Sequence, residues 1–171
     1  MTLAPFDPDV RDRDVIVFSK GPSFTTQIDS VLKTQGWAGG QGVQWTDDPT
    51  SDTFIVTVSH GLPGGFLVWG SNESADQYIS YTENQPTYSF ATYCFGTWTI
   101  STRTYELYTL ASRTAGPLVL NNYVVGEPLY FSLRGLFTNQ DESGLGFVVG
   151  SVMQVPNGTL NLNYLGVSTQ T

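Results

Sequence analysis

The sequence predicts a mainly β protein, an antiparallel β-sandwich or barrel of about 9–10 strands with one short α-helix near residues 23–36. Two observations lead to this prediction. From residue 37 onward, short runs of β-branched and aromatic residues alternate with Gly, Pro, Asn and Asp, as strands and turns do. Only one segment has the spacing of an amphipathic helix, whereas parallel α/β folds need a helix between successive strands.

The 171 residues are expected to form one β-rich domain, residues 14–171, preceded by an extended N-terminal arm, residues 1–13. Pro5, Pro8 and alternating Asp and Arg residues favour an extended conformation in the arm. The first residues lack the apolar region of a signal peptide, and no run approaches the roughly 18 apolar residues of a membrane span. The sequence therefore predicts a protein that is made in a host cytoplasm and is not secreted.

The predicted helix follows a first strand over residues 14–19. Its apolar residues recur at i, i+4, i+7 and i+8: Phe24, Ile28, Val31 and Leu32. Ser23 or Thr25 can cap its first turn, and Gly36 can end it in the left-handed conformation. A single apolar stripe over about three turns predicts a helix that packs on a sheet.

The remaining strands are expected at residues 53–59, 65–70, 77–82, 88–95, 97–110, 118–125, 129–137, 146–155 and 159–167. The strand at 88–95 has no charged residue, and both of its faces are half apolar. A strand with one face in solvent alternates between apolar and polar residues. This strand is therefore expected to be covered on both sides, by the helix, by a loop or by another subunit.

The net charge of −8 is unevenly distributed along the chain. Residues 34–102 contain six acidic residues and no Lys or Arg, so this block alone carries −6. Nucleic-acid binding depends on phosphate neutralisation by Lys and Arg, and an anionic membrane repels an acidic surface. The sequence therefore predicts neither a nucleic-acid partner nor a membrane partner. The acidic block is interpreted as a solvated face, with an electronegative lumen or partner surface as the alternative.

Candidate catalytic residues are few. Cys94 is the only cysteine, which excludes an internal disulfide, and its apolar surroundings predict a buried structural residue. His60 is the only histidine, and no G-x-S-x-G motif accompanies it, so it is expected to bond within its own turn. The alternative is a hydrolase that uses His60 as a base. We predict that the protein is not an enzyme.

The acidic cluster Asp47, Asp48 and Asp52 offers oxygen ligands but lacks the spacing of an EF-hand loop. It is interpreted as a surface turn. One His and one Cys cannot form a structural zinc site. We therefore predict no metal and no cofactor.

The four tryptophans, Trp37, Trp45, Trp69 and Trp98, are either core and interface anchors or part of a sugar-stacking platform. Trp98 lies in the middle of a predicted strand and is expected in the core. Trp37 follows the end of the predicted helix and is expected to be exposed. The interface interpretation is favoured over glycan binding, for which Trp37 and Trp45 are the candidates.

The arm "LAPFDPDVRDRD", the small helix "SFTTQIDSVLKTQG", and many short strands rich in Thr, Ser, Gly, Asn and Tyr occur together in an acidic, cysteine-poor chain. In this combination the whole chain resembles structural proteins of tailed bacteriophage virions, which are commonly small β-sandwiches or barrels with mobile arms. The resemblance implies a component of the tail, baseplate, fibre, head (capsid) surface or head-to-tail joint. Its function would be self-assembly or the joining of other particle proteins, and its location the virion.

The partners expected are other copies of this chain and other virion proteins. The candidate subunit-interface residues are Arg11, Arg13 and Trp37, with the two arginines meeting an acidic surface such as that of residues 34–102. The alternative function is a carbohydrate-binding or host-attachment β-sandwich module, in which exposed aromatic rings stack on a glycan.

Overall fold

A computed structural model of the chain describes residues 15–35, 37–48, 53–71, 90–156 and 164–171. These residues form mainly β structure with two short helices, so the predicted fold class is confirmed. The predicted arm, residues 1–13, lies outside the described residues, and so do Arg11, Arg13 and the predicted strand at 77–82.

The elements occur along the chain as follows: β1 (Val15–Ser19), β2 (Ser23–Ile28), α1 (Ser30–Gln35), β3 (Gly42–Asp48), β4 (Thr53–Val58), β5 (Gly65–Ser71), β6 (Phe90–Cys94), β7 (Thr99–Thr102), α2 (Leu110–Thr114), β8 (Pro128–Phe131), β9 (Phe137–Thr138), β10 (Gly150–Gln154) and β11 (Leu165–Thr169).

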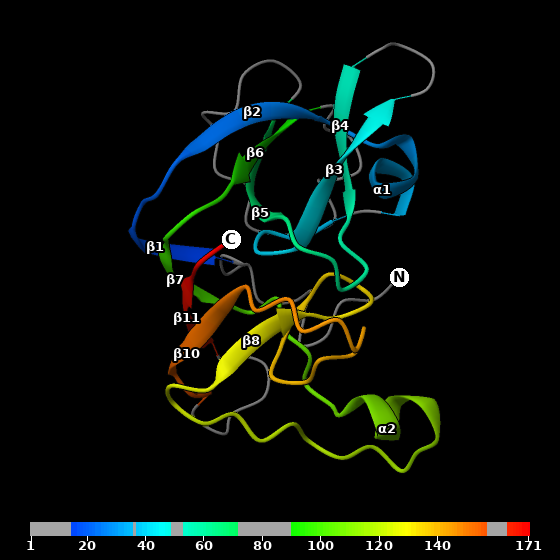
Figure 1. Cartoon of the computed structure of the whole chain (residues 1–171), viewed down its shortest axis with the longest axis vertical. Coiled ribbons are helices and arrows are strands. Elements are labelled where there is room, and N and C mark those ends of the chain that lie inside the picture. Colours follow the sequence, from blue (N-terminus) through cyan, green and yellow to red (C-terminus); the bar gives the residue numbers. More distant parts are fainter. Residues whose placement is uncertain (1–14, 36, 49–52, 72–89, 157–163) are drawn as a thin grey trace.

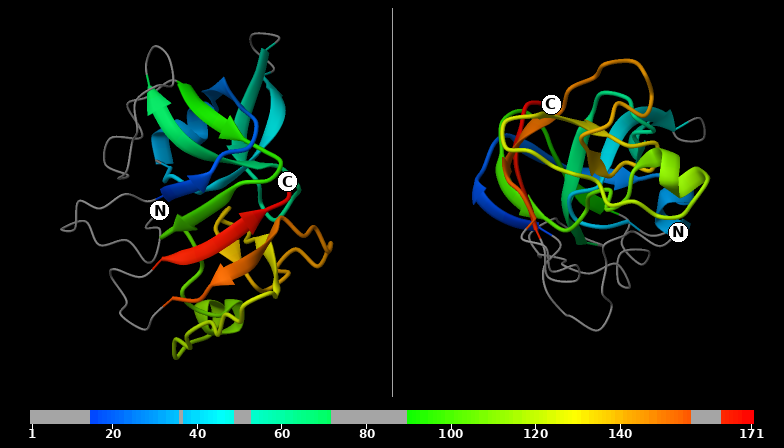
Figure 2. Two further views of the ribbon diagram at one scale, coloured as in Figure 1. Left: turned by 90° about the vertical axis from the view of Figure 1, so that its left-hand side faces the viewer. Right: turned by 90° about the horizontal axis from the view of Figure 1, so that it is seen from below.

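Two sheets make up the fold (Figures 1 and 2). The first is a closed barrel with the strand order β2-β4-β3-β5-β6, and the second is a six-stranded sheet with the order β1-β7-β11-β10-β8-β9. All neighbouring strands are antiparallel except β2 and β4, which are parallel. Helix α1 lies beside β3 and β4, and α2 lies at the end of the molecule opposite the barrel (Figure 1).

Two glycines allow β5 to fit closely between its neighbours in the barrel. A Cβ atom at Gly64 would lie 2.0 Å from the Val43 carbonyl oxygen, and one at Gly65 would lie 2.2 Å from the Cys94 carbonyl oxygen. Both distances are far below van der Waals contact, so any side chain here would separate the strands. The "PGG" turn is therefore a requirement of barrel closure.

The predicted helix at 23–36 is wrong in its first half, where the chain forms strand β2. Ser23–Gln27 pair with Phe90–Cys94 in an antiparallel register, and Phe24, Thr26 and Ile28 alternate toward the barrel interior. Pairing with distant strands outweighs the local helical spacing. The helix begins only at Ser30, and its cap is Asp29, whose carboxylate accepts hydrogen bonds from the backbone N–H groups of Val31 (3.1 Å) and Leu32 (3.3 Å).

The predicted long strand at 97–110 is also shorter than expected. It ends as β7 at Thr102, and the chain then enters α2, which the sequence did not predict. Thr109 caps α2 by accepting a hydrogen bond from the Ser112 N–H. The predicted strand at 118–125 is not part of either sheet, and its only ladder contact in the described chain is a bridge between Leu120 and Tyr108.

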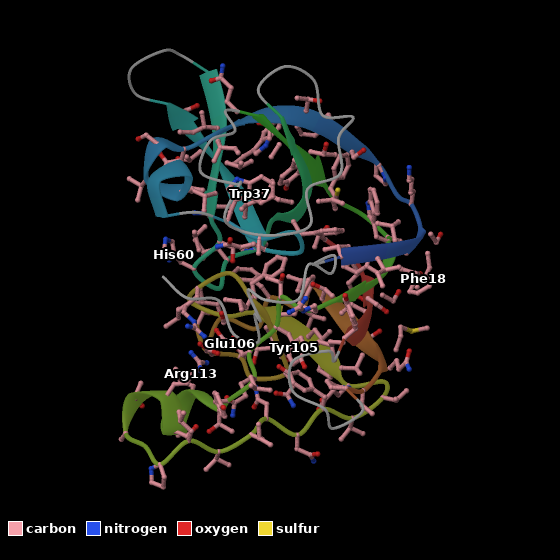
Figure 3. All side chains as sticks on the ribbon, turned by 180° about the vertical axis from the view of Figure 1, so that it is seen from behind. Phe18, Trp37, His60, Tyr105, Glu106 and Arg113 are labelled. Carbon is pink, nitrogen blue, oxygen red and sulfur yellow. The ribbon has the colours of Figure 1, made fainter. Side chains whose placement is uncertain are left out.

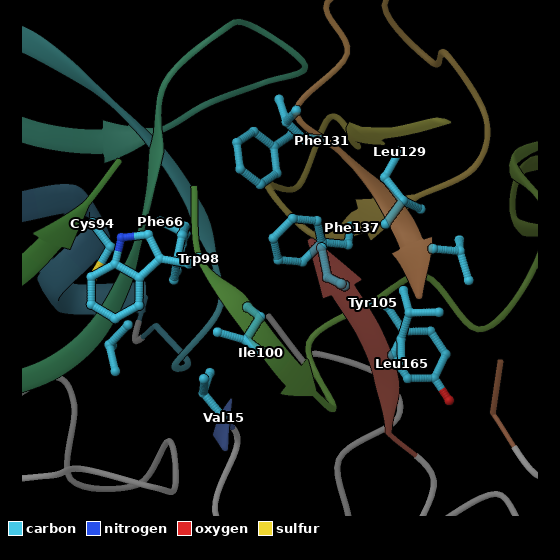
Figure 4. Close-up of a cluster of buried hydrophobic side chains, with 14 of the residues drawn as sticks. Val15, Phe66, Cys94, Trp98, Ile100, Tyr105, Leu129, Phe131, Phe137 and Leu165 are labelled. Atoms are coloured by element: carbon cyan, nitrogen blue, oxygen red, sulfur yellow. The ribbon is translucent and has the colours of Figure 1, made fainter. Parts of the chain in front are cut away.

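Two apolar clusters fill the fold. One is the barrel core, which includes Ile28, Leu32, Trp37, Val43, Val56, Val58, Leu67 and Ala91. The other lies between the barrel and the six-stranded sheet and includes Val15, Phe66, Cys94, Trp98, Ile100, Phe131, Phe137 and Leu165 (Figure 4). Strand β6 separates the clusters, since Ala91 faces the first and Cys94 the second. The strand is therefore covered by its own chain on both faces at Ala91 and Cys94, whereas Tyr93 and Phe95 stay partly exposed.

Candidate binding surfaces

Cys94 is completely buried, as predicted for a structural residue. Burial raises the pKa of its thiol far above the ordinary value, and the more distant charge of Lys20 only partly opposes this. The nucleophilic form of cysteine is the thiolate. At neutral pH the Cys94 side chain is therefore a neutral, apolar group of the core.

We expect Cys94 to react with a thiol reagent such as Ellman's reagent at least about tenfold more slowly in the native protein than in the urea-unfolded protein at pH 8. The reason is that the thiol is both shielded and protonated. The measurement is the time course of absorbance with and without urea. Equal rates in the two states would contradict the buried position.

His60 lies in the turn after β4 and adopts a left-handed backbone conformation, with φ 50°. Its Nδ1 atom lies 3.1 Å from the carbonyl oxygen of Leu133, so it bonds to a loop 73 residues away in the chain rather than to its own turn. This corrects the predicted partner. The side chain is exposed and links the barrel to the loop that joins β8 and β9 (Figure 3).

Asp47 and Asp48 are the last residues of β3 rather than part of a turn, and Asp52 lies outside the described residues. Within the described part of the chain, no group of three or more His, Cys, Asp or Glu residues is placed to hold a metal ion. Over the same residues, no helix is long and apolar enough to cross a membrane.

Trp37 is fully buried, so the prediction that it is exposed and available to a second subunit is wrong. After α1 the chain turns back into the barrel, and the indole packs in the barrel core (Figure 3). Trp98 is in the core, as predicted. Trp45 is the exposed tryptophan among these three, with 45% of its surface accessible.

A buried ion network joins four segments that no sequence motif connects. The side chain of Glu106 is fully buried and accepts hydrogen bonds from Arg134 Nε (3.0 Å) and Nη2 (2.5 Å). Arg113 of α2 lies 3.5 Å from the same carboxylate and also bonds to Glu142. Burial raises the pKa of Glu142 and Glu106 adds to the rise, while Arg113 lowers it. The network fixes α2 to the body of the protein.

A long apolar surface follows α2. We call residues 114–126 the aliphatic arm. All residues from 114 to 120 are exposed, and five large aliphatic side chains in the arm are each 53–61% exposed: Leu118, Val119, Leu120, Val124 and Val125. The Gly126 N–H donates to the Val152 carbonyl (2.8 Å), which places the end of the arm next to the exposed Met153 of β10.

Hydrogen bonds to the body of the protein fix the backbone of the aliphatic arm, although its aliphatic side chains are exposed. The Thr109 N–H donates to the Val119 carbonyl (2.9 Å), and the Asn121 N–H donates to the Leu107 carbonyl (2.8 Å). The buried Tyr123 hydroxyl donates to the Glu106 carbonyl (2.5 Å). The aliphatic side chains are therefore presented on a fixed backbone.

The second surface is an open hollow of about 420 Å³ at the edge of the barrel core, which we call the aromatic hollow. It is lined by Phe24, Trp45, Pro63, Gly64, Tyr93, Phe95 and Thr171. Phe24, Trp45 and Tyr93 occupy strand positions with the same parity as the barrel-core residues Ile28, Val43 and Ala91, so their rings extend the barrel core to the surface. Burial raises the pKa of Tyr93 above its ordinary value.

Comparison of the sequence with models of known protein families and with curated proteins found no match.

Proposed function

We propose that this protein is a structural component of a virion and that it works by assembly, with copies binding one another and other particle proteins through the aliphatic arm. The observation that carries the proposal is the run of seven consecutive exposed residues at 114–120, which includes Leu118, Val119 and Leu120. Soluble proteins rarely expose a continuous apolar surface unless it binds something. The proposed activity is non-enzymatic.

The energetics of the arm fit contact with a second copy. Somewhat more than half of each of the five aliphatic side chains remains to be buried, which corresponds to roughly 4–8 kcal/mol per copy when full burial of a Val or Leu is worth about 1.5–3 kcal/mol. A two-fold contact uses the same patch twice, giving roughly 8–17 kcal/mol. Association itself costs about 4–15 kcal/mol. The arm can therefore support association that depends on protein concentration.

Charge also favours the arm as the place where copies meet. Each copy carries a net charge of −8, so copies repel one another at long range. Residues 114–126 contain no charged residue, and the ion network behind them holds Arg113 and Arg134 against Glu106. The arm itself therefore contributes no charged side chain to a contact between copies.

The resemblance of the sequence to structural proteins of tailed phages supports the virion as the setting. The same resemblance supports other particle proteins as partners alongside further copies. Arg11 and Arg13 of the N-terminal arm stay candidates for contact with a neighbouring acidic surface.

We expect Leu118→Asp and Val125→Asp to fold normally and to weaken self-association at least about tenfold, because each places a charge in the contact. The measurement is molar mass by sedimentation from about micromolar to hundreds of micromolar protein. Phe18→Asp is the matched control, because Phe18 is 68% exposed but lies on β1, away from the arm. Unchanged association in both arm variants, or an equal loss in the control, would contradict the proposal.

A further inference from the structure

Four aromatic rings lie close together in the wall of the aromatic hollow. The Tyr93 ring lies 5.3 Å from Phe24, 5.7 Å from Trp45 and 6.0 Å from Phe95, at interplanar angles of 38°, 38° and 31°. Tyr93 therefore contacts its three aromatic neighbours at moderate tilts. The two contacts of Phe24 with Trp45, at 4.8 Å and 70°, and with Phe95, at 5.7 Å and 58°, are steeper.

The chemistry of the hollow restricts its ligand. No charged side chain lines it, and neither Lys nor Arg is present to bind a phosphate or a carboxylate. An aromatic lining buries C–H surface well, since ring faces carry partial negative charge and C–H groups partial positive charge. The ligand should therefore be uncharged and should present a flat C–H face.

Polar groups lie around the rings. Asp47 is exposed and lies two residues beyond Trp45 on the same strand face, about 7 Å along β3. The Tyr93 hydroxyl stays protonated at neutral pH and can donate a hydrogen bond. A ligand with an apolar face and hydroxyl groups at its rim matches this arrangement.

We propose that the aromatic hollow is a binding site for a neutral saccharide, with a sugar ring stacked on Trp45 and Tyr93 and its hydroxyl groups directed toward Asp47. The volume of about 420 Å³ lies within the range of small-ligand sites, about 300–1,000 Å³, and suits one or two sugar rings. The site is on the barrel, whereas the aliphatic arm is beside the six-stranded sheet. Saccharide binding is therefore a property additional to assembly and does not depend on it.

The test is titration of the full chain with neutral di- and trisaccharides built from glucose, galactose and N-acetylglucosamine, followed by saturation-transfer NMR and calorimetry. We expect weak binding of at least one of these sugars, weakened at least about tenfold in Trp45→Ala and largely retained in Trp45→Phe, which keeps a ring. Phe18→Ala is the control, because it removes an exposed aromatic ring outside the hollow and should leave binding unchanged.

Three outcomes would overturn the saccharide site. One is the absence of binding to every sugar up to about 20 mM, which corresponds to an interaction too weak to be specific. The second is binding that Trp45→Ala leaves intact. The third is a change in molar mass in Trp45→Ala without any sugar binding, which would identify the hollow as a protein contact. Circular dichroism and thermal unfolding of each variant establish that the fold is retained.

Discussion

Replacing Glu106 with alanine is expected to destabilise the protein by about 3 kcal/mol. Breaking a buried ion pair by removing one partner costs about 3–5 kcal/mol, because the remaining charge stays buried without compensation. We expect the lower end of this energy range, because the side chains of Arg113 and Arg134 keep 16% and 29% of their surface exposed and water can solvate them in part. Domains of this size are stable by only about 5–15 kcal/mol, so the loss would be a large fraction of the total.

Urea unfolding followed by tryptophan fluorescence measures this effect. Glu106→Gln keeps the shape of the side chain and removes its charge, so it should lose nearly as much stability as the alanine variant. Asp47→Ala is the matched control, an exposed carboxylate whose removal should change the free energy of unfolding by no more than about 0.5 kcal/mol. A Glu106→Ala variant as stable as this control would show that the network contributes nothing to the fold.

Replacing Trp98 with alanine is expected to have the largest effect on stability, about 3–5 kcal/mol, the usual cost of removing a buried large aromatic side chain. Trp98 is 1% exposed and contacts the Phe66 ring edge-on, with centroids 5.7 Å apart. Its Nε1 atom donates to the carbonyl oxygens of Pro22 (3.2 Å) and Phe95 (3.0 Å). The indole therefore joins the barrel to the six-stranded sheet (Figure 4).

Two further variants separate the contributions of this side chain. Trp98→Phe keeps most of the ring but removes the indole donor from the Phe95 carbonyl oxygen, whereas the Pro22 carbonyl oxygen keeps the Phe95 N–H (3.1 Å), so we expect an intermediate loss of about 1–3 kcal/mol. Trp45→Ala removes an indole that is 45% exposed and contacts Phe24 and Tyr93, so it should cost less than Trp98→Ala, about 1–3 kcal/mol. Thermal or urea unfolding measures the stability of both variants. A Trp98→Ala variant as stable as Trp45→Ala would contradict the role of Trp98 as a core anchor.

The fold class was predictable because the signals for it are local. Turn residues and short β-branched runs mark strands wherever they occur, and strands β4, β5, β10 and β11 overlap segments expected from these signals. The error at residues 23–28 has a non-local cause. Phe24 and Ile28 satisfy both a helical and a strand spacing, and pairing with β6, more than 60 residues away, decides between them.

The binding surfaces were not predictable from the sequence, because they too depend on contacts between distant segments. Phe24, Trp45 and Tyr93 come from three strands that only barrel closure brings together. Residues 118–125 were predicted as a strand, because a strand and an exposed arm have the same local signature. The position of Trp37 depends on how the chain re-enters the barrel after α1, which no short-range pattern encodes.

Self-assembly through the aliphatic arm is the proposed function. It is tested most directly by measuring the molar mass of the unmodified protein as a function of its concentration. Sedimentation equilibrium from about 1 µM to several hundred µM covers the range in which contacts of the estimated strength form. We expect the mass to rise from 18.7 kDa to that of a dimer or a larger discrete assembly. A mass that stays at 18.7 kDa at every concentration would contradict self-assembly.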